Sequence, residues 1–293
     1  MRNMVSVSFS KYLASAVSII AISFGFIGYS NAAPTHSRVP ASLFIASSSK
    51  PATATSSQLD LPLLIKTGES FFKGSNYQTV SEMQLRGAKQ NTDVTFYIQA
   101  KTTVNSTNQF RSEIAFTQDG KPSKESAVVV SDGKQVYIYR PDLKQYSVIS
   151  FQAFNKSDDS FLIGLSSSFF LEFANNMGKY IASGALSQPE VIKEISTAAN
   201  QAIQGETRDI EGKQTYVYSF NDPKQGYTIS AFVNPQLANL EQMQIVGKDD
   251  GLDIAIIEKI QQRTEVKNLA PQTFKFTPPK GAKKVKSLSI SPF

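Results

Sequence analysis

The residue types that most often carry catalysis or bind transition metals are nearly absent from this chain. Its 293 residues include one histidine, His36, and no cysteine. A Ser-His-Asp triad or a Cys-His pair needs an ordered imidazole, and zinc, iron and copper sites usually need histidine or cysteine ligands. The sequence also has no phosphate-binding glycine loop. We therefore predict a protein that is not an enzyme and that uses no cofactor and no metal.

Carboxylates are the remaining groups that could do chemistry. Asp158-Asp159 and Asp249-Asp250-Gly251 could bind calcium or form an acid pair. Adjacent acids in turns are more commonly solvated, or they cap a helix, and we interpret both clusters in that way. Chemistry by lysine, tyrosine or serine stays open, and a hydrolase of that kind predicts a polar cleft with perturbed acids.

Apolar and aromatic side chains, by contrast, are abundant, with 20 Phe, 11 Tyr and no Trp. An open sheet with one apolar face needs a cover, and helices are the obvious one. Taken singly, each of these side chains is best explained as core. Taken together, they also fit an apolar cavity between sheet and helices that could receive an acyl chain.

The N-terminal residues have the features of an export signal. Arg2 and Lys11 precede an apolar stretch at 13–29, and small residues follow at 30–33. This pattern predicts a secretory signal peptide over residues 1–32; the alternative is an uncleaved membrane anchor, since the stretch approaches spanning length. Without cysteine, stability must come from a packed core rather than disulfides. We expect a soluble periplasmic protein.

Residues 33–58 are rich in Ser, Thr, Ala and Pro and are predicted to be a disordered spacer, which contains His36. The net charge of the chain is +6, and several lysines lie near the C-terminus. These lysines are either a solvated tail or a weak, transient contact with anionic lipid head groups at a membrane surface. Nucleic acid is not an expected partner of an exported protein that lacks an aromatic-basic motif.

Periodicity predicts the elements of a single domain over residues 59–286, followed by a C-terminal tail at 287–293. A helix is expected from Asp60 to Gly74, because its apolar residues recur at helical spacing. One or two helices are expected at about 156–206, with a capping box at Ser187–Glu190 and an end at Gly205. Strands with period two are expected near 77–86, 93–104, 109–118, 125–131, 135–140, 144–150, 213–221, 226–233, 240–248, 252–264 and 273–276.

Turn residues such as Asp132-Gly133 lie between successive strands and are typical of antiparallel hairpins rather than βαβ units. The predicted fold class is therefore α+β. It consists of a strongly curved antiparallel sheet with helices against its concave face.

Three stretches resemble the LolA-like superfamily of periplasmic lipid and lipoprotein carriers. SDGKQVYIYRP at 131–141 is similar to its "SDG-x-x-aromatic-x-Tyr-x-Pro" hairpin, and NQFRSEI at 108–114 to the preceding strand. FKFTPPKGA at 274–282 is similar to its C-terminal "F-x-F-x-x-P-x-G" ending. The stretches occur in the family's order, and a related group of uncharacterised exported proteins shares them. The arginine and proline that precede the aromatic residue of the second stretch in the lipoprotein carrier are absent here.

The resemblance implies an incomplete antiparallel barrel of about eleven strands around a helix, with helical lids over an apolar cavity. It implies a non-catalytic binding or transport protein that holds a lipid or acylated ligand, without a cofactor, for transfer or sensing in the cell envelope. The alternative is an envelope protein-interaction or stress-sensing module of the same fold, with a filled core and a protein partner.

Candidate ligand-binding residues come from alternating strand positions and from the phenylalanine-rich segment at 161–173. The candidate lining residues are Phe96, Ile98, Ile114, Phe116, Val128, Val130, Tyr137, Tyr139, Phe232 and Ile256. Phe161, Leu165 and Phe169 are predicted to form a movable lid, because three serines at 166–168 interrupt the apolar pattern. An error of one residue reverses which strand face points inward, so the choice between Val136 and Tyr137 stays open.

Overall fold

The computed structural model describes residues 55–56, 59–89, 92–118, 121–222, 226–249 and 252–291. The predicted signal peptide lies outside these ranges, and so does the predicted spacer apart from Thr55–Ser56. His36 and Asp250 also lie outside the described residues. In the described ranges, no helix has both the length and the apolar character that a membrane crossing requires.

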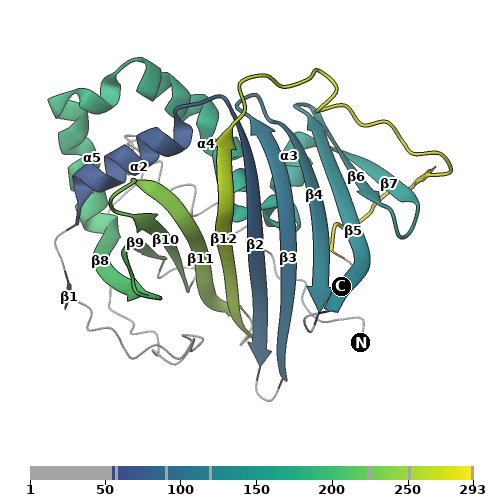
Figure 1. The fold of residues 1–293 in the computed structure, drawn as a ribbon, viewed down its shortest axis with the longest axis horizontal. Helices are drawn as coiled ribbons and strands as arrows, with labels where there is room; N and C mark the ends of the chain where they lie inside the picture. Colours follow the sequence, from purple (N-terminus) through teal and green to yellow (C-terminus); the bar gives the residue numbers. More distant parts are fainter. Residues whose placement is uncertain are drawn as a thin grey trace.

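One sheet of 13 strands forms the framework of the fold (Figure 1). Its spatial order is β1-β8-β9-β10-β11-β12-β2-β3-β4-β5-β6-β7-β13. Neighbouring strands are antiparallel except β7 and β13, which are parallel. The strands are β1 (Thr55–Ser56), β2 (Asn76–Lys89), β3 (Thr92–Asn105), β4 (Gln109–Gln118), β5 (Lys121–Asp132), β6 (Gln135–Arg140), β7 (Gln145–Ser150), β8 (Ile203–Ile210), β9 (Lys213–Asp222), β10 (Tyr227–Asn234), β11 (Asn239–Asp249), β12 (Leu252–Glu265) and β13 (Lys283–Lys284). Because β1 and β13 lie at opposite edges, the sheet is open, and the predicted incomplete barrel of the α+β class is confirmed.

A tight turn between β5 and β6 shows how local sequence produces the hairpins. Gly133 has a φ of 95°, which glycine adopts without a Cβ clash. The side chain of Asp132 accepts hydrogen bonds from the backbone N–H groups of Lys134 and Gln135, each at 2.8 Å. The antiparallel pairing predicted for the stretch 128–146 is confirmed by the pairing of β5, β6 and β7.

The helices gather on one face of the sheet (Figure 1). They are α2 (Leu61–Phe72), α3 (Phe151–Asn155), α4 (Leu165–Ala182) and α5 (Pro189–Ala202), with 3-10 helices η2 (Ser160–Ile163) and η3 (Ala185–Ser187). The predicted start of α2 is confirmed, since the Asp60 carboxylate caps the helix by accepting the N–H of Leu63 at 3.0 Å. α2 buries Leu63, Thr67, Phe71 and Phe72.

The main core lies between the inner face of the sheet and α4. Leu165, Phe170, Leu171 and Phe173 of α4 are all buried, and they belong to one cluster with inward strand residues such as Met83. Consecutive positions of this helix are buried on several sides, which is typical of a core helix rather than a surface helix. α4 therefore occupies the space that the sheet curves around.

The region after α5 differs from its prediction. Gly205 was expected to end a helix, but the helix ends at Ala202 and Gly205 lies within β8. A Cβ atom at position 205 would collide with the ring of Tyr216. Gly205 is thus selected by the close approach of a neighbouring strand, which local sequence does not reveal.

Two further local predictions were wrong, and the C-terminal segment has contacts that were not predicted. Gln188 is the N-cap of α5, with no side-chain capping bond, so the predicted capping box at Ser187–Glu190 does not form. Residues 273–276 form a turn and irregular chain rather than a strand. Ile290, in the stretch predicted to be a tail, is fully buried in the main core, whereas the pairing of Lys283–Lys284 with β7 was not predicted.

Candidate functional site

Half of the predicted lining residues lie on the inner face of the sheet. Directly opposite residues on antiparallel strands share a face, and Ile98 pairs with both Met83 and Phe116. The predicted residues on this face are Phe96, Ile98, Ile114, Phe116 and Ile256. All of them except the partly exposed Phe96 are buried in the main core cluster.

Four predicted lining residues lie on the opposite face of β5 and β6. Val128 pairs with Tyr139, and Val130 pairs with Tyr137. The C-terminal segment covers these tyrosines, because the ring of Phe276 lies 5.3 Å from that of Tyr137 and 6.2 Å from that of Tyr139. The open choice at this hairpin is thereby answered, since the neighbouring Val136 is the residue that joins the main core.

The predicted lid residues form the start of the central helix. Phe161 lies in η2 and Leu165 opens α4, and both side chains are buried. Phe169 is partly buried, with its ring 5.9 Å from Phe71 and 4.7 Å from Phe173. The segment that the sequence suggested as a flap therefore packs inside the sheet.

A buried carboxylate fastens the start of α4 to the sheet. Glu258 on β12 accepts hydrogen bonds from the backbone N–H of Ser166 at 2.7 Å and from its hydroxyl at 3.0 Å. The first N–H groups of a helix have no partner within the helix, so Glu258 supplies a cap from another element. Burial raises the pKa of Glu258, while these hydrogen bonds, one from Ser81 and the charge of Arg263 act in the opposite direction.

Arg263 lies between the sheet and the helices as a partly buried cation. Its guanidinium carbon is 3.9 Å from the ring centre of Phe71, 3.8 Å from Tyr77 and 5.2 Å from Phe170, distances at which a cation is attracted to an aromatic face. One N–H donates to the backbone carbonyl of Phe71 at 2.8 Å, and another reaches the hydroxyl of Thr79 at 3.4 Å. Burial lowers the pKa of Arg263 to about 10.

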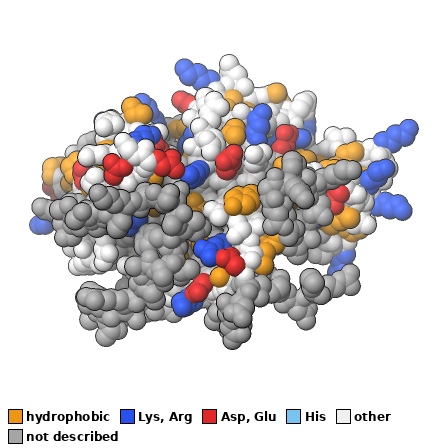
Figure 2. All heavy atoms as spheres, turned by 60° about the horizontal axis from the view of Figure 1, so that its bottom comes forward, with side chains coloured by type: hydrophobic (Ala, Val, Ile, Leu, Met, Phe, Trp, Pro, Cys, Tyr) orange, Lys and Arg blue, Asp and Glu red, His pale blue; other side chains and the backbone are white. Residues whose placement is uncertain are grey.

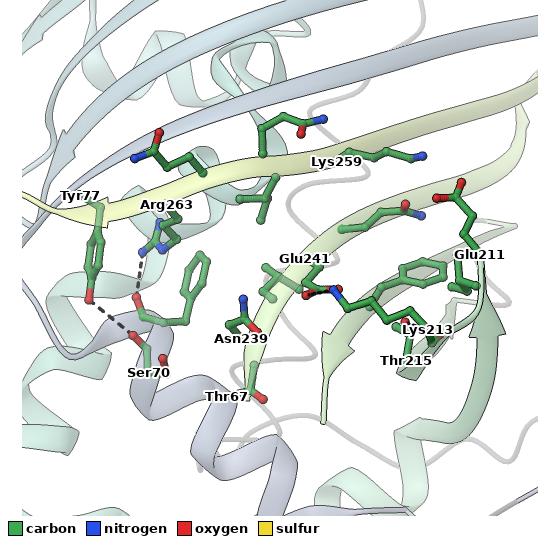
Figure 3. A pocket seen from close by; sticks show the side chains of 18 residues that line it. Thr67, Ser70, Tyr77, Glu211, Lys213, Thr215, Asn239, Glu241, Lys259 and Arg263 are labelled. Carbon is green, nitrogen blue, oxygen red and sulfur yellow. Dashed lines mark hydrogen bonds and ion pairs between the residues drawn. The ribbon is translucent and has the colours of Figure 1, made fainter. Parts of the chain in front are cut away.

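A window opens where β11 and β12 separate. Their pairing ends at Gln242 and Lys259, whereas β12 continues beside β2 to Glu265. A hollow of about 540 Å³ occupies this gap, within the range of small-molecule sites. Figure 3 shows the gap between the two strands, with Thr67 and Ser70 of α2 on one side.

The hollow combines an apolar wall with a polar rim. The apolar lining is Phe71, Ile210, Phe232, Leu240 and Ile260, and the charged lining is Glu211, Lys213, Glu241, Lys259 and Arg263. At the rim, Lys213 and Glu241 form an ion pair of 2.8 Å. Such an arrangement can hold a chain of methylene groups at one end and a polar group at the other.

Phe232 is the only predicted lining residue at this hollow, and the residues that shape it were not predicted. Arg263 reaches the inner side because the pairing of β12 with β2 shifts between Ile260 and Gln262. No local pattern signals that bulge. Glu258, by contrast, alternates with Ile254 and Ile256, and that alternation was a usable signal for an inward carboxylate.

Figure 2 shows acidic, basic and isolated apolar side chains interspersed over the described part of the face that it presents. Within the described residues, no group of three or more acidic or histidine side chains is placed to hold a metal ion.

Asp159 differs from its interpretation as a solvated or capping residue. Its carboxylate is partly buried and accepts hydrogen bonds from the Ser289 hydroxyl at 2.9 Å and the Ile290 N–H at 2.7 Å. It makes no side-chain capping bond to η2. Burial raises the pKa of Asp159. Asp159 thus holds the C-terminal segment against the helices.

Comparisons with known proteins find similarity in solved structures only. No protein-family profile matches the chain, and a search of curated proteins finds no match. An uncharacterized conserved protein from Thermus thermophilus is 11% identical, with a TM-score of 0.39 over 78% of this chain and 100% of that one. LprF from Mycobacterium bovis is 12% identical, with a TM-score of 0.34 over 76% and 96%.

The LolA superfamily protein NE2245 from Nitrosomonas europaea is 12% identical, with a TM-score of 0.31 over 75% of this chain and 99% of that one. Similarity at these values carries no inference about ligand or activity.

Proposed function

We propose that this protein is a non-catalytic binding protein, exported to the periplasm, that holds an acyl chain or a comparable apolar ligand for transfer or sensing in the cell envelope. The observation that carries the proposal is the window between β11 and β12. Its apolar wall includes Phe71, which is also part of the aromatic cluster that α2 and α4 form over the sheet. A ligand chain that enters the window therefore meets apolar surface continuous with the core.

The energetics suit reversible binding. Burial of an acyl chain contributes about 0.8 kcal/mol per CH₂, so a chain of about 16 carbons gains roughly 12 kcal/mol before costs. Lost translational freedom and ordering of the site reduce this by several kcal/mol. The remainder is comparable with partitioning into a membrane, so the ligand can be taken up and released without covalent chemistry.

Two measurements test this function. Lipids extracted from the purified protein are identified by mass spectrometry, and binding of a fluorescent acyl probe is titrated. We expect a co-purifying lipid or saturable probe binding that a Leu240→Glu substitution in the apolar wall weakens at least about tenfold, because it places a charge against the chain. A protein that carries no lipid and binds no acyl probe refutes the proposal.

The filled inner face favours a second candidate function. Phe170 and Leu165 of α4 occupy the concave side of the sheet with exposures of 0% and 1%. An envelope protein-interaction or stress-sensing module would use such a core for rigidity and bind its partner elsewhere. It predicts a stable protein partner in cross-linking of intact cells and no displacement of α4 by any lipid.

A further inference from the structure

Arg263 is a partly buried cation that forms no ion pair in the described part of the chain. Its side chain makes no ion pair with any described carboxylate, although Glu258 lies near enough to raise its pKa through charge. Buried charges in proteins are normally paired or fully hydrogen-bonded. The arrangement at Arg263 is therefore incomplete in the described protein.

The guanidinium also has spare hydrogen-bonding capacity. An arginine side chain has five N–H donors and no acceptor. Two contacts are made, to the Phe71 carbonyl and to the Thr79 hydroxyl, the second at a long 3.4 Å. The guanidinium carbon also lies over the rings of Tyr77 and Phe170. The other donors have no acceptor among the described residues.

These donors belong to a residue that lines the window hollow (Figure 3). The apolar wall beside Arg263 includes Phe71, Leu240 and Ile260. A second cation, Lys259, lines the same hollow and forms no ion pair with a described acid. The acids of the hollow are Glu211 and Glu241, of which Glu241 is engaged with Lys213.

We infer that the hollow binds a single-chain amphiphile with one acidic head group, and this inference rests on the proposed function. The carboxylate or phosphate oxygens of the head accept hydrogen bonds from Arg263. The chain lies along the apolar wall. Arg263 suits this role because its planar fork matches carboxylate and phosphate oxygens, and because its partial burial reduces the competition of water.

The test compares ligands of equal chain length on the purified protein. Dodecanoate, dodecyl phosphate and uncharged 1-dodecanol compete with a fluorescent acyl probe, and inorganic phosphate is titrated alone. A hydrogen bond to a charged group contributes about 1.5–3 kcal/mol, and each 1.4 kcal/mol is tenfold in affinity. We therefore expect both acidic amphiphiles to bind at least about tenfold more tightly than dodecanol.

Variants test whether Arg263 is the source of the preference for an acidic head group. Arg263→Gln is expected to reduce the difference between dodecanoate and dodecanol to about twofold or less, and Arg263→Lys to retain part of it. Lys134→Gln, at an exposed turn after β5, removes the same charge far from the hollow and is expected to keep the full difference. If a substitution at 263 prevents folding, the ligand series on the unmodified protein still shows whether an acidic head group is preferred.

The outcomes separate the two proposals. Equal affinity for dodecanoate and dodecanol overturns the acidic head group and leaves apolar binding intact. Binding of inorganic phosphate as tightly as dodecyl phosphate shows a site for a free anion and overturns the amphiphile. Failure of all three amphiphiles refutes the proposed function as well.

Discussion

The stability of the protein should depend on pH through the buried Glu258, and Glu258→Gln isolates this dependence. The side chain is fully buried and its pKa is raised above the ordinary value of 4.5, chiefly by burial. The folded protein therefore keeps this proton at pH values where the unfolded chain has lost it. Glutamine has nearly the same shape and cannot titrate.

The sign and magnitude follow from proton linkage. Between pH 4.5 and the raised pKa of Glu258, the native state binds one more proton than the unfolded state. The free energy of unfolding then falls as pH rises, by at most about 1.4 kcal/mol per pH unit. Below pH 4.5 both states are protonated and this contribution to stability is fully present.

The assay is urea unfolding of the protein and of Glu258→Gln at several pH values from 4 to 8. We expect the stability of the unmodified protein, relative to the variant, to decline as pH rises above 4.5. Glu194→Gln, which removes an exposed carboxylate on α5, serves as the control and should show no such trend. A difference that stays constant or increases over this range would refute the assignment of a raised pKa to Glu258.

Three other substitutions test the packing around the candidate site. Phe170→Ala removes a fully buried ring and should lower the free energy of unfolding by about 3–5 kcal/mol, measured against Phe170→Leu; a loss below about 1 kcal/mol would contradict the buried position. Gly164→Ala should destabilise by more than about 1 kcal/mol, because φ is 103° and a Cβ would lie 2.7 Å from Glu258; stability equal to that of Gly178→Ala, where nothing lies near the added carbon, would contradict this. Asp159→Ala leaves the Ile290 N–H without its acceptor and should speed proteolysis of the C-terminal segment; an unchanged cleavage rate would show that this bond does not hold it.

Sequence pattern predicted the parts of the fold that depend on local chemistry. The period of two located β2 to β7 and β9 to β12, and the capping carboxylate of Asp60 located the start of α2. The turn at Asp132-Gly133 needs only its own side chain and a positive φ. These features are readable because each is decided by neighbouring residues.

Features that depend on the pairing of strands could not be predicted from local sequence. Alternation from Ile256 and Glu258 would place position 262 inward and Arg263 outward, but a bulge after Ile260 reverses this. A bulge inserts one residue and turns the following side chains to the other face. The buried Glu258 runs against the usual exposure of glutamate. The sequence could thus predict that the site has an apolar wall, but it could not predict which charged residues line the site.

The window and the central helix are joined through the same side chains. Arg263 contacts Phe71 of α2, which lines the window, and Phe170 of α4, which fills the inner face. A ligand that engages Arg263 must share it with these rings. The ligand can shift the position of α4 only to the extent that it binds one arrangement of these rings more tightly than another.

We therefore expect the binding of acidic amphiphiles and the docking of α4 to be energetically coupled, so that Phe170→Ala changes the affinity for dodecanoate as well as the stability. Hydrogen exchange of the Ser166 amide, with and without dodecanoate, measures that coupling; identical exchange in both conditions would show that the window binds its ligand independently of the helix.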